Sequence, residues 1–190
     1  MAAFRKSGIG LPFVGEGTNP PVLPDGSLPD KGYVKCMNEA KQSLCGAVGE
    51  LLRKTGVAPR SIDVVVTACT VFTPVPSLAT MLVHEYGMRS DVVTVPLAGA
   101  GCSAGVLGLQ VAADMLAARP GSRALFACFE STVAGTYVGP DPTMQLVTML
   151  FRQGGAAVLL TNCPSAGAKA KYVLAHSVRV HAGADDKAYG

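Results

Sequence analysis

Three short runs of almost unbroken apolar sequence, rich in β-branched residues, constrain what this chain can fold into. They are IDVVVTAC (62–69), DVVTVPL (91–97) and RALFACF (123–129). Strands that are buried on both faces have this pattern, and parallel sheets contain such strands. Apolar residues spaced three or four apart predict helices from Asp30 to Gly56, over 77–86 and over 102–118. Strand and helix alternate three times, which predicts a layered α/β fold.

Local signals refine these elements. Gly56 is a typical helix stop, and Ser77 is suited to be an N-cap. The 102–118 segment is apolar on nearly every side, which predicts a central, buried helix. Further strands are predicted for GAAVLL and KYVLAHSVRV, of which the second alternates as a half-exposed strand does. Residues 1–30 are expected to form a largely extended lead-in, and residues 131–143 a loop.

Composition limits the class of protein. The chain has 190 residues, 49% of them hydrophobic and 15% charged, which suits one domain with a substantial core. A net charge of +3 with scattered basic residues argues against a nucleic-acid partner. No stretch is long and apolar enough for a membrane-spanning helix, and the start lacks the apolar run of a signal peptide. The six cysteines form no C-x-x-C pair, which favours reduced thiols over disulfides or a zinc site.

The glycine-rich turn after the second predicted strand has three interpretations. Gly99 to Ala104 match G-x-G-x-x-A between a strand and a helix, as a dinucleotide fingerprint requires. Glu130 would be the ribose-binding acid, although it comes later than the roughly 20 residues typical of that motif. Alternatively, Cys102 is a nucleophile, because the start of a helix favours the thiolate form. The third interpretation is a cysteine that only packs in the core.

A resemblance bears on this choice. The segments that carry it are RKSGIG, NEAKQSLCGAV, VFTPVPSLATMLVHEYGMRSDV, GAGCSAGVLGLQVAADMLAARPGSRALFACFE, TYVGPD, MLFRQGGAAVLLTN and HSVRVHAGADDKAYG. In this order they closely resemble the plant-type 3-ketoacyl-CoA synthases, the fatty-acid elongase condensing enzymes of the thiolase superfamily. The resemblance covers nearly the whole chain.

What the resemblance implies is specific. The fold would be thiolase-like, with αβαβα layers, and residues 1–190 would be its N-terminal half. Cys102 would be the nucleophile that holds the acyl group, and Phe151 would line the substrate pocket. The substrates would be an acyl-CoA and malonyl-CoA, with no cofactor and no metal. The protein would be a homodimer that works with other elongase components at the cytosolic face of the endoplasmic reticulum membrane.

The sequence also departs from the family. The catalytic His and Asn of the family come from a second half, and its N-terminal membrane helices are also absent from these residues, so the resemblance implies an inactive fragment. The family's Thr-Glu-Asn-Ile-Thr stretch reads Phe-Glu-Ser-Thr-Val at 129–133, which alters the expected acyl-chain preference. Glu130 is expected either at the rim of the substrate cavity or at a solvated strand end. A non-catalytic partner with the same fold is a further alternative.

The remaining candidates are expected to be structural. His84 should be a surface or interface residue, and His176 and His181 should face opposite sides of one strand, which argues against joint metal binding. Asp185 and Asp186 are expected in a solvated turn. The other five cysteines are assigned to packing, and Arg152 is of interest only because it adjoins Phe151.

Overall fold

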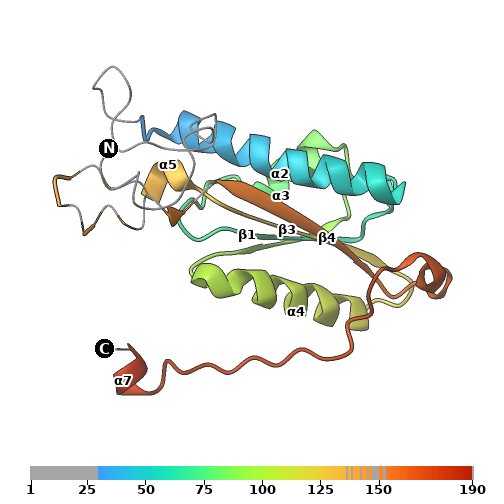
Figure 1. Cartoon of the computed structure of the whole chain (residues 1–190). Coiled ribbons are helices and arrows are strands. Elements are labelled where there is room, and N and C mark those ends of the chain that lie inside the picture. Colours follow the sequence, from blue (N-terminus) through green and yellow to red (C-terminus); the bar gives the residue numbers. More distant parts are fainter. Residues whose placement is uncertain are drawn as a thin grey trace.

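The structure is a computed structural model that describes residues 30–189 except 136, 138, 142, 145, 147–149 and 152. A four-stranded sheet lies between helices on its two faces (Figure 1). Its strands are β1 (Val64–Ala68), β2 (Val93–Leu97), β3 (Arg123–Glu130) and β4 (Gly154–Thr161). Their order is β2-β1-β3-β4, in which β1 pairs in parallel with β2 and β3, and β4 is antiparallel to β3.

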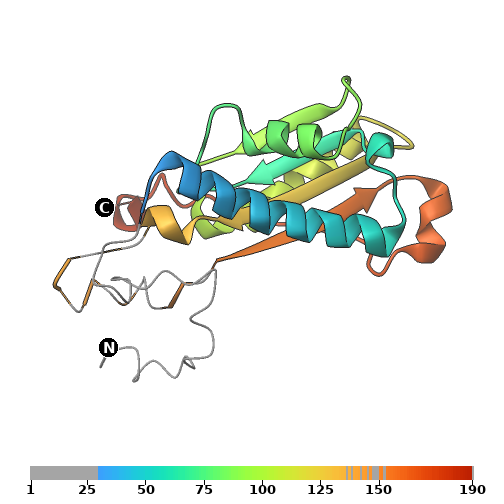
Figure 2. The ribbon, with the colours of Figure 1, turned by 90° about the horizontal axis from the view of Figure 1, so that it is seen from above.

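Helices cover both faces of this sheet. α2 (Tyr33–Thr55) contacts β3 and β4, and α3 (Leu78–Glu85) contacts β1 and β2 on the same face, as seen from above in Figure 2. α4 (Ala104–Ala117) covers the opposite face. The resulting αβα sandwich contains three of the five layers expected. No described helix combines the length and apolar character needed to cross a bilayer.

The core explains why the apolar runs became strands. All five residues of β1 are buried. Val65 packs with Leu44 and Leu82 under α2 and α3, whereas its neighbour Val66 packs with Phe126 under α4. Side chains of a strand alternate between faces, so only a run without polar interruptions can bury both faces. The predicted parallel strands are therefore confirmed. The expected burial of β2 was wrong, because β2 lies at the edge of the sheet and its residues alternate between half-buried and exposed.

The predicted helix boundaries also hold. α2 ends at Gly56, whose φ of +66° places it in the left-handed region that terminates helices. α3 begins after Ser77, whose hydroxyl accepts a hydrogen bond from the N–H of Thr80 at 3.2 Å. This is the N-cap interaction that the sequence predicted.

α4 is not the fully buried helix that was predicted. Its buried residues form one stripe at a spacing of four, Ala104, Gly108, Ala112 and Leu116, and this stripe faces the sheet. Val106, on another side of the helix, is 55% exposed. The prediction was wrong because the sheet covers one face of α4, and the described residues place no second layer over the other.

The segment 171–180 is extended but is not the predicted strand. It pairs with no described strand, and every residue in it is exposed. It follows a 3-10 helix, η4 (Pro164–Lys169), and runs on the α4 side of the molecule. Residues 181–185 connect it to α7 (Asp186–Tyr189) (Figure 1). Within the predicted 131–143 loop, a short helix, α5 (Thr132–Gly135), replaces the first part. The predicted lead-in lies outside the described residues, apart from Asp30.

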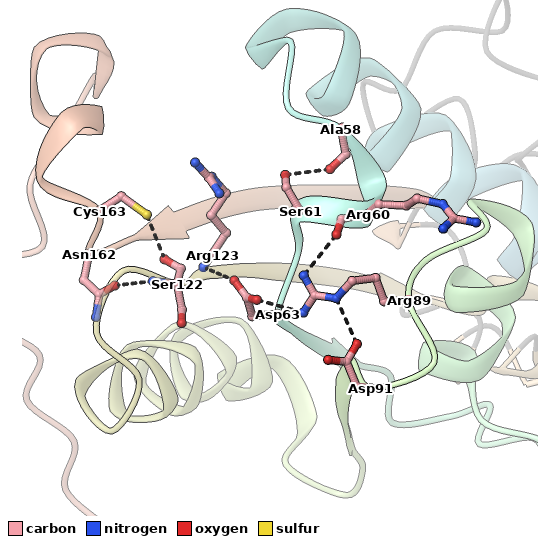
Figure 3. Close-up of polar contacts among 10 residues, drawn as sticks. All are labelled: Ala58, Arg60, Ser61, Asp63, Arg89, Asp91, Ser122, Arg123, Asn162 and Cys163. Atoms are coloured by element: carbon pink, nitrogen blue, oxygen red, sulfur yellow. Dashed lines mark hydrogen bonds and ion pairs between the residues drawn. The ribbon is translucent and has the colours of Figure 1, made fainter.

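Polar contacts lock the amino ends of β1 and β3 together (Figure 3). Asp63, just before β1, accepts hydrogen bonds from the Arg123 N–H at 2.8 Å and from the Arg89 guanidinium at 2.9 Å. Arg89 also bonds Asp91 and the carbonyl of Arg60. Burial alone would raise the pKa of Asp63, but the bonds from Arg123 and Arg89 outweigh it, so the pKa is lowered.

Candidate active site

Cys102 lies at the carboxyl ends of the parallel strands, in a tight turn between β2 and α4. The turn is one short 3-10 helix, η3 (Gly101–Ser103), that runs directly into α4. Gly99 and Gly101 have φ values of +71° and +57°, a conformation that other residues rarely adopt. The Ser103 hydroxyl donates to the carbonyl of Ala100 at 2.6 Å and closes the turn. The predicted position of Cys102 at the start of the helix is thus confirmed.

Exposure separates Cys102 from the other cysteines. All six are free thiols, and Cys102 is the only one that is exposed. Burial raises the pKa of Cys45 and Cys128, and it raises the pKa of Cys69 to about 12. A thiol with a raised pKa is a poor nucleophile at neutral pH, because the thiolate is the reactive form. Among the cysteines, Cys102 is therefore the best candidate for covalent chemistry.

The close packing of α4 against β3 determines how near the Cys102 turn lies to the sheet. At Gly108, a Cβ atom would lie 2.1 Å from Cε2 of Phe126 in β3. No side chain fits between helix and sheet at this point. Gly108 thus allows α4 to approach β3, and η3 continues without a break from that helix.

Two hollows adjoin the turn. The first, of about 580 Å³, lies between the turn and residues 178–183, and its lining includes Ser103, Arg179 and His181. The second, of about 410 Å³, lies between the loop after β1 and the end of β2, and its lining is largely apolar, with Phe72, Leu78 and Leu97 among its residues. Both hollows border Ala98, four residues before Cys102, but Cys102 itself lines neither of them.

Glu130 lies at the carboxyl end of β3 and is engaged with the protein itself. Its Oε2 accepts from the N–H of Thr70 at 2.9 Å, and its Oε1 accepts from the N–H of Val71 at 2.8 Å. The thiol of Cys69 donates to Oε1 at 3.2 Å. Of the two positions expected for Glu130, the hydrogen-bonded one near a cavity agrees with these contacts, because Cys69 lines the second hollow.

The other predicted residues are more dispersed. Phe151 is 54% exposed and lines neither hollow, although it lies near β4 residue Gly154, which pairs with Glu130 at the same end of the sheet. His181 borders the first hollow, and its Nδ1 accepts a hydrogen bond from the N–H of Gly183 at 3.1 Å. His176 is exposed on the same extended segment, so its predicted strand geometry does not apply.

The predictions for His84, Asp185 and Asp186 concern the surface. His84 is exposed on α3, as predicted. Asp185 and Asp186 lie in an exposed turn and at the start of α7, also as predicted. No group of three metal-ligating side chains occurs among the described residues. Arg152 lies outside the part of the chain that the structure describes.

A buried acid near the carboxyl end of β3, Glu39, was not identified from the sequence. Glu39 of α2 is only 6% exposed, and its Oε2 accepts from the Ser131 hydroxyl at 2.7 Å. Gln153 donates to the carbonyl of Glu39 at 3.2 Å and to the Ser43 hydroxyl at 2.8 Å. The only signal was a charged residue within the apolar stripe of the first helix. These bonds join α2 to the segments on either side of the β3–β4 connection.

Comparison with known proteins decides the family. The family model described as FAE1/Type III polyketide synthase-like protein matches residues 3–190. The chain belongs to this family. 3-Ketoacyl-CoA synthase 2 of Arabidopsis thaliana is 42% identical over 158 residues, which cover 81% of this chain and 30% of that protein. 3-Ketoacyl-CoA synthase 4 of the same plant is 38% identical over 186 residues, which cover 98% and 36%.

A solved structure confirms the fold class. 1,3,6,8-Tetrahydroxynaphthalene synthase of Streptomyces coelicolor, a bacterial type III polyketide synthase, matches 70% of this chain and 38% of its own. The TM-score is 0.64 and the identity 26%. The thiolase-like fold predicted from the resemblance is thus confirmed. The chain spans about a third of the length of the curated relatives that it matches.

Membership of the FAE1/type III polyketide synthase-like family also weighs against the dinucleotide interpretation. In the structure, both oxygens of Glu130 are bonded to the loop after β1, so this acid is not placed to bind a ribose. The two left-handed glycines serve instead to form the turn that exposes Cys102.

Proposed function

We propose that this chain is part of a 3-ketoacyl-CoA synthase that condenses a long-chain acyl-CoA with malonyl-CoA in very-long-chain fatty acid elongation. The observation that carries the proposal is the exposed Cys102 on a tight turn after β2, in a family member 42% identical to a 3-ketoacyl-CoA synthase. In this proposal residues 1–190 are the N-terminal half of the condensing domain.

The chemistry begins at the sulfur of Cys102. Its thiolate attacks the thioester carbonyl of an acyl-CoA, the carbon–sulfur bond to CoA breaks, and CoA leaves as a thiol after taking a proton. Malonyl-CoA then loses carbon dioxide, and the carbanion left on its C2 attacks the acyl-cysteine carbonyl. The bond to Cys102 breaks, which releases a 3-ketoacyl-CoA and returns the thiolate.

Both steps place negative charge on a carbonyl oxygen, and positioned donors stabilise such oxygens by roughly 3 kcal/mol each. By family resemblance, a His and an Asn of the family's second half would supply these donors. We therefore propose that condensation requires the remainder of the protein. Phe151 would contact the acyl chain, and Glu130 would belong to the cavity rim.

The assembly is proposed from the same resemblance. The protein would be a homodimer that cooperates with other elongase components at the cytosolic face of the endoplasmic reticulum. A non-catalytic partner of the same fold is the alternative, and it would keep the fold and the dimer surface without turnover.

The test is a comparison of three proteins: the 190-residue chain, the chain fused to the C-terminal part of 3-ketoacyl-CoA synthase 2, and that fusion with Cys102→Ala. Incorporation of radiolabelled malonyl-CoA into 3-ketoacyl product should appear only in the unmodified fusion. Turnover by the Cys102→Ala fusion would disprove the role of Cys102, and full turnover by the 190 residues would disprove the need for a second half.

A further inference from the structure

The carboxylate of Glu130 joins two segments that lie far apart in the sequence. Glu130 ends β3, and the segment Cys69–Val71 follows β1. The N–H groups of Thr70 and Val71 donate to different oxygens of the carboxylate at 2.9 and 2.8 Å, and the Cys69 thiol donates at 3.2 Å. Hydrogen bonds to an ionised acceptor are about twice as strong as neutral ones. The carboxylate thus holds three consecutive residues.

These three residues begin the loop that forms one wall of the apolar hollow. Cys69 itself and Phe72, Pro74 and Leu78 beyond it line that hollow. The opposite wall consists of residues 96–98, which lead directly into the turn with Cys102. A shift at the start of the loop therefore changes the shape of this hollow.

We propose that Glu130 is a positioning residue, whose carboxylate holds the Cys69–Val71 segment and thereby sets one wall of the apolar hollow that borders residues 96–98, just before the cysteine turn. The effect on acyl-CoA binding rests on the proposed function, whereas the positioning of Cys69–Val71 by Glu130 does not. This role differs from a direct substrate contact, because both oxygens are already occupied by backbone donors.

The chemistry of the side chain explains why glutamate is needed. A carboxylate accepts at both oxygens, whereas the amide of glutamine accepts at one and donates at the other. In Glu130→Gln, one of the two backbone N–H groups consequently faces an NH₂ group instead of an acceptor. In Glu130→Ala, neither N–H keeps its bond to residue 130.

Hydrogen exchange on the 190-residue chain tests this hold directly. Amide exchange at Thr70 and Val71 should become roughly ten- to hundredfold faster in Glu130→Ala, with Glu130→Gln between this variant and the wild type. Glu85→Gln is the matched control, because Glu85 forms an ion pair with Lys41 on the helical surface. It should leave Thr70 and Val71 unchanged.

Two outcomes would overturn the proposal. The first is unchanged exchange at Thr70 and Val71 in Glu130→Gln and Glu130→Ala. The second is loss of protection throughout Val64–Ala68 in Glu130→Gln, since Glu130 would then support the whole sheet and not the loop.

Kinetics of the fusion protein separate this proposal from the proposed function. Glu130→Gln should raise the KM for a long-chain acyl-CoA by roughly tenfold with a smaller change in kcat, because the wall moves and the thiol does not. A merely destabilising change would lower the amount of active enzyme and leave KM unaltered. If the unmodified fusion does not condense but the exchange results are as expected, the proposed function fails and the positioning role of Glu130 stands.

Discussion

Replacing Gly108 by alanine should destabilise the protein, although alanine is the better helix former. The methyl group would lie 2.1 Å from Cε2 and 2.4 Å from Cζ of Phe126. Carbon atoms in contact are about 3.5 Å apart, so helix or ring must move by roughly 1.4 Å. Phe126 is 3% exposed in the middle of β3, and its neighbours leave it little room to move.

The size of the effect follows from two opposing contributions. Overpacking a core costs about 1–3 kcal/mol, and a contact this short belongs at the upper end. The change from glycine to alanine within a helix contributes about 1 kcal/mol in the other direction. Gly108→Ala should therefore lower the free energy of unfolding by about 2 kcal/mol.

Gly105→Ala is the matched control. Gly105 lies one turn earlier in α4, and a Cβ atom there would meet nothing within 4 Å. It should stabilise the protein by about 0.5–1 kcal/mol. Urea unfolding followed by circular dichroism at 222 nm measures both variants. Equal stability of the two would refute the steric argument, whereas a Phe126→Leu substitution that rescues only Gly108→Ala would support it.

Three further predictions test individual contacts. Asp63→Asn should destabilise the protein at neutral pH and progressively less in acid. Because the pKa of Asp63 is lowered in the folded state, its contribution is complete above the ordinary value of 3.8 and declines as pH falls toward the folded-state value, so the effect on the urea midpoint should be smaller at pH 3 than at pH 7. Ser77→Ala should cost about 1 kcal/mol through loss of the N-cap, and an unchanged urea midpoint would contradict it. Limiting iodoacetamide at pH 7.5 should modify Cys102 first, because it is the exposed cysteine. Cys69, with a pKa of about 12, should stay unmodified up to about pH 9. Mass mapping that finds Cys69 modified first would disprove this order.

The sequence predicted the sheet and its covering helices because their signals are local. A strand buried on both faces has to be almost entirely apolar, as β1 is apart from Thr67, and a helix end needs a residue such as Gly56 or Ser77. The position of Cys102 at the start of a helix was predicted for the same reason, since the glycines that bend the chain lie next to it. Its role as nucleophile came from the family resemblance and stays a prediction.

Features that depend on distant partners were not predictable. The segment 171–180 alternates as a strand does, but a strand exists only where a neighbour supplies hydrogen bonds. Likewise, Gly105 and Gly108 are equivalent in the sequence, and only the packing of α4 on Phe126 distinguishes them. The contacts of Glu130 depend on the pairing of Ala68 with Cys128, a register that no local pattern encodes.

A carboxylate holds the register between β1 and β3 at each end of these strands. At the amino end, Asp63 before β1 binds the N–H of Arg123, the first residue of β3. At the carboxyl end, Glu130, the last residue of β3, binds the N–H groups of Thr70 and Val71 after β1. A slip of one residue would break both sets of bonds and exchange the side chains that pack on the two faces of the sheet. The two acids nevertheless have different consequences. Asp63 lies far from the cysteine turn, so its loss should affect stability alone, whereas Glu130 holds the loop that borders the apolar hollow, so its loss should also alter what that hollow can bind.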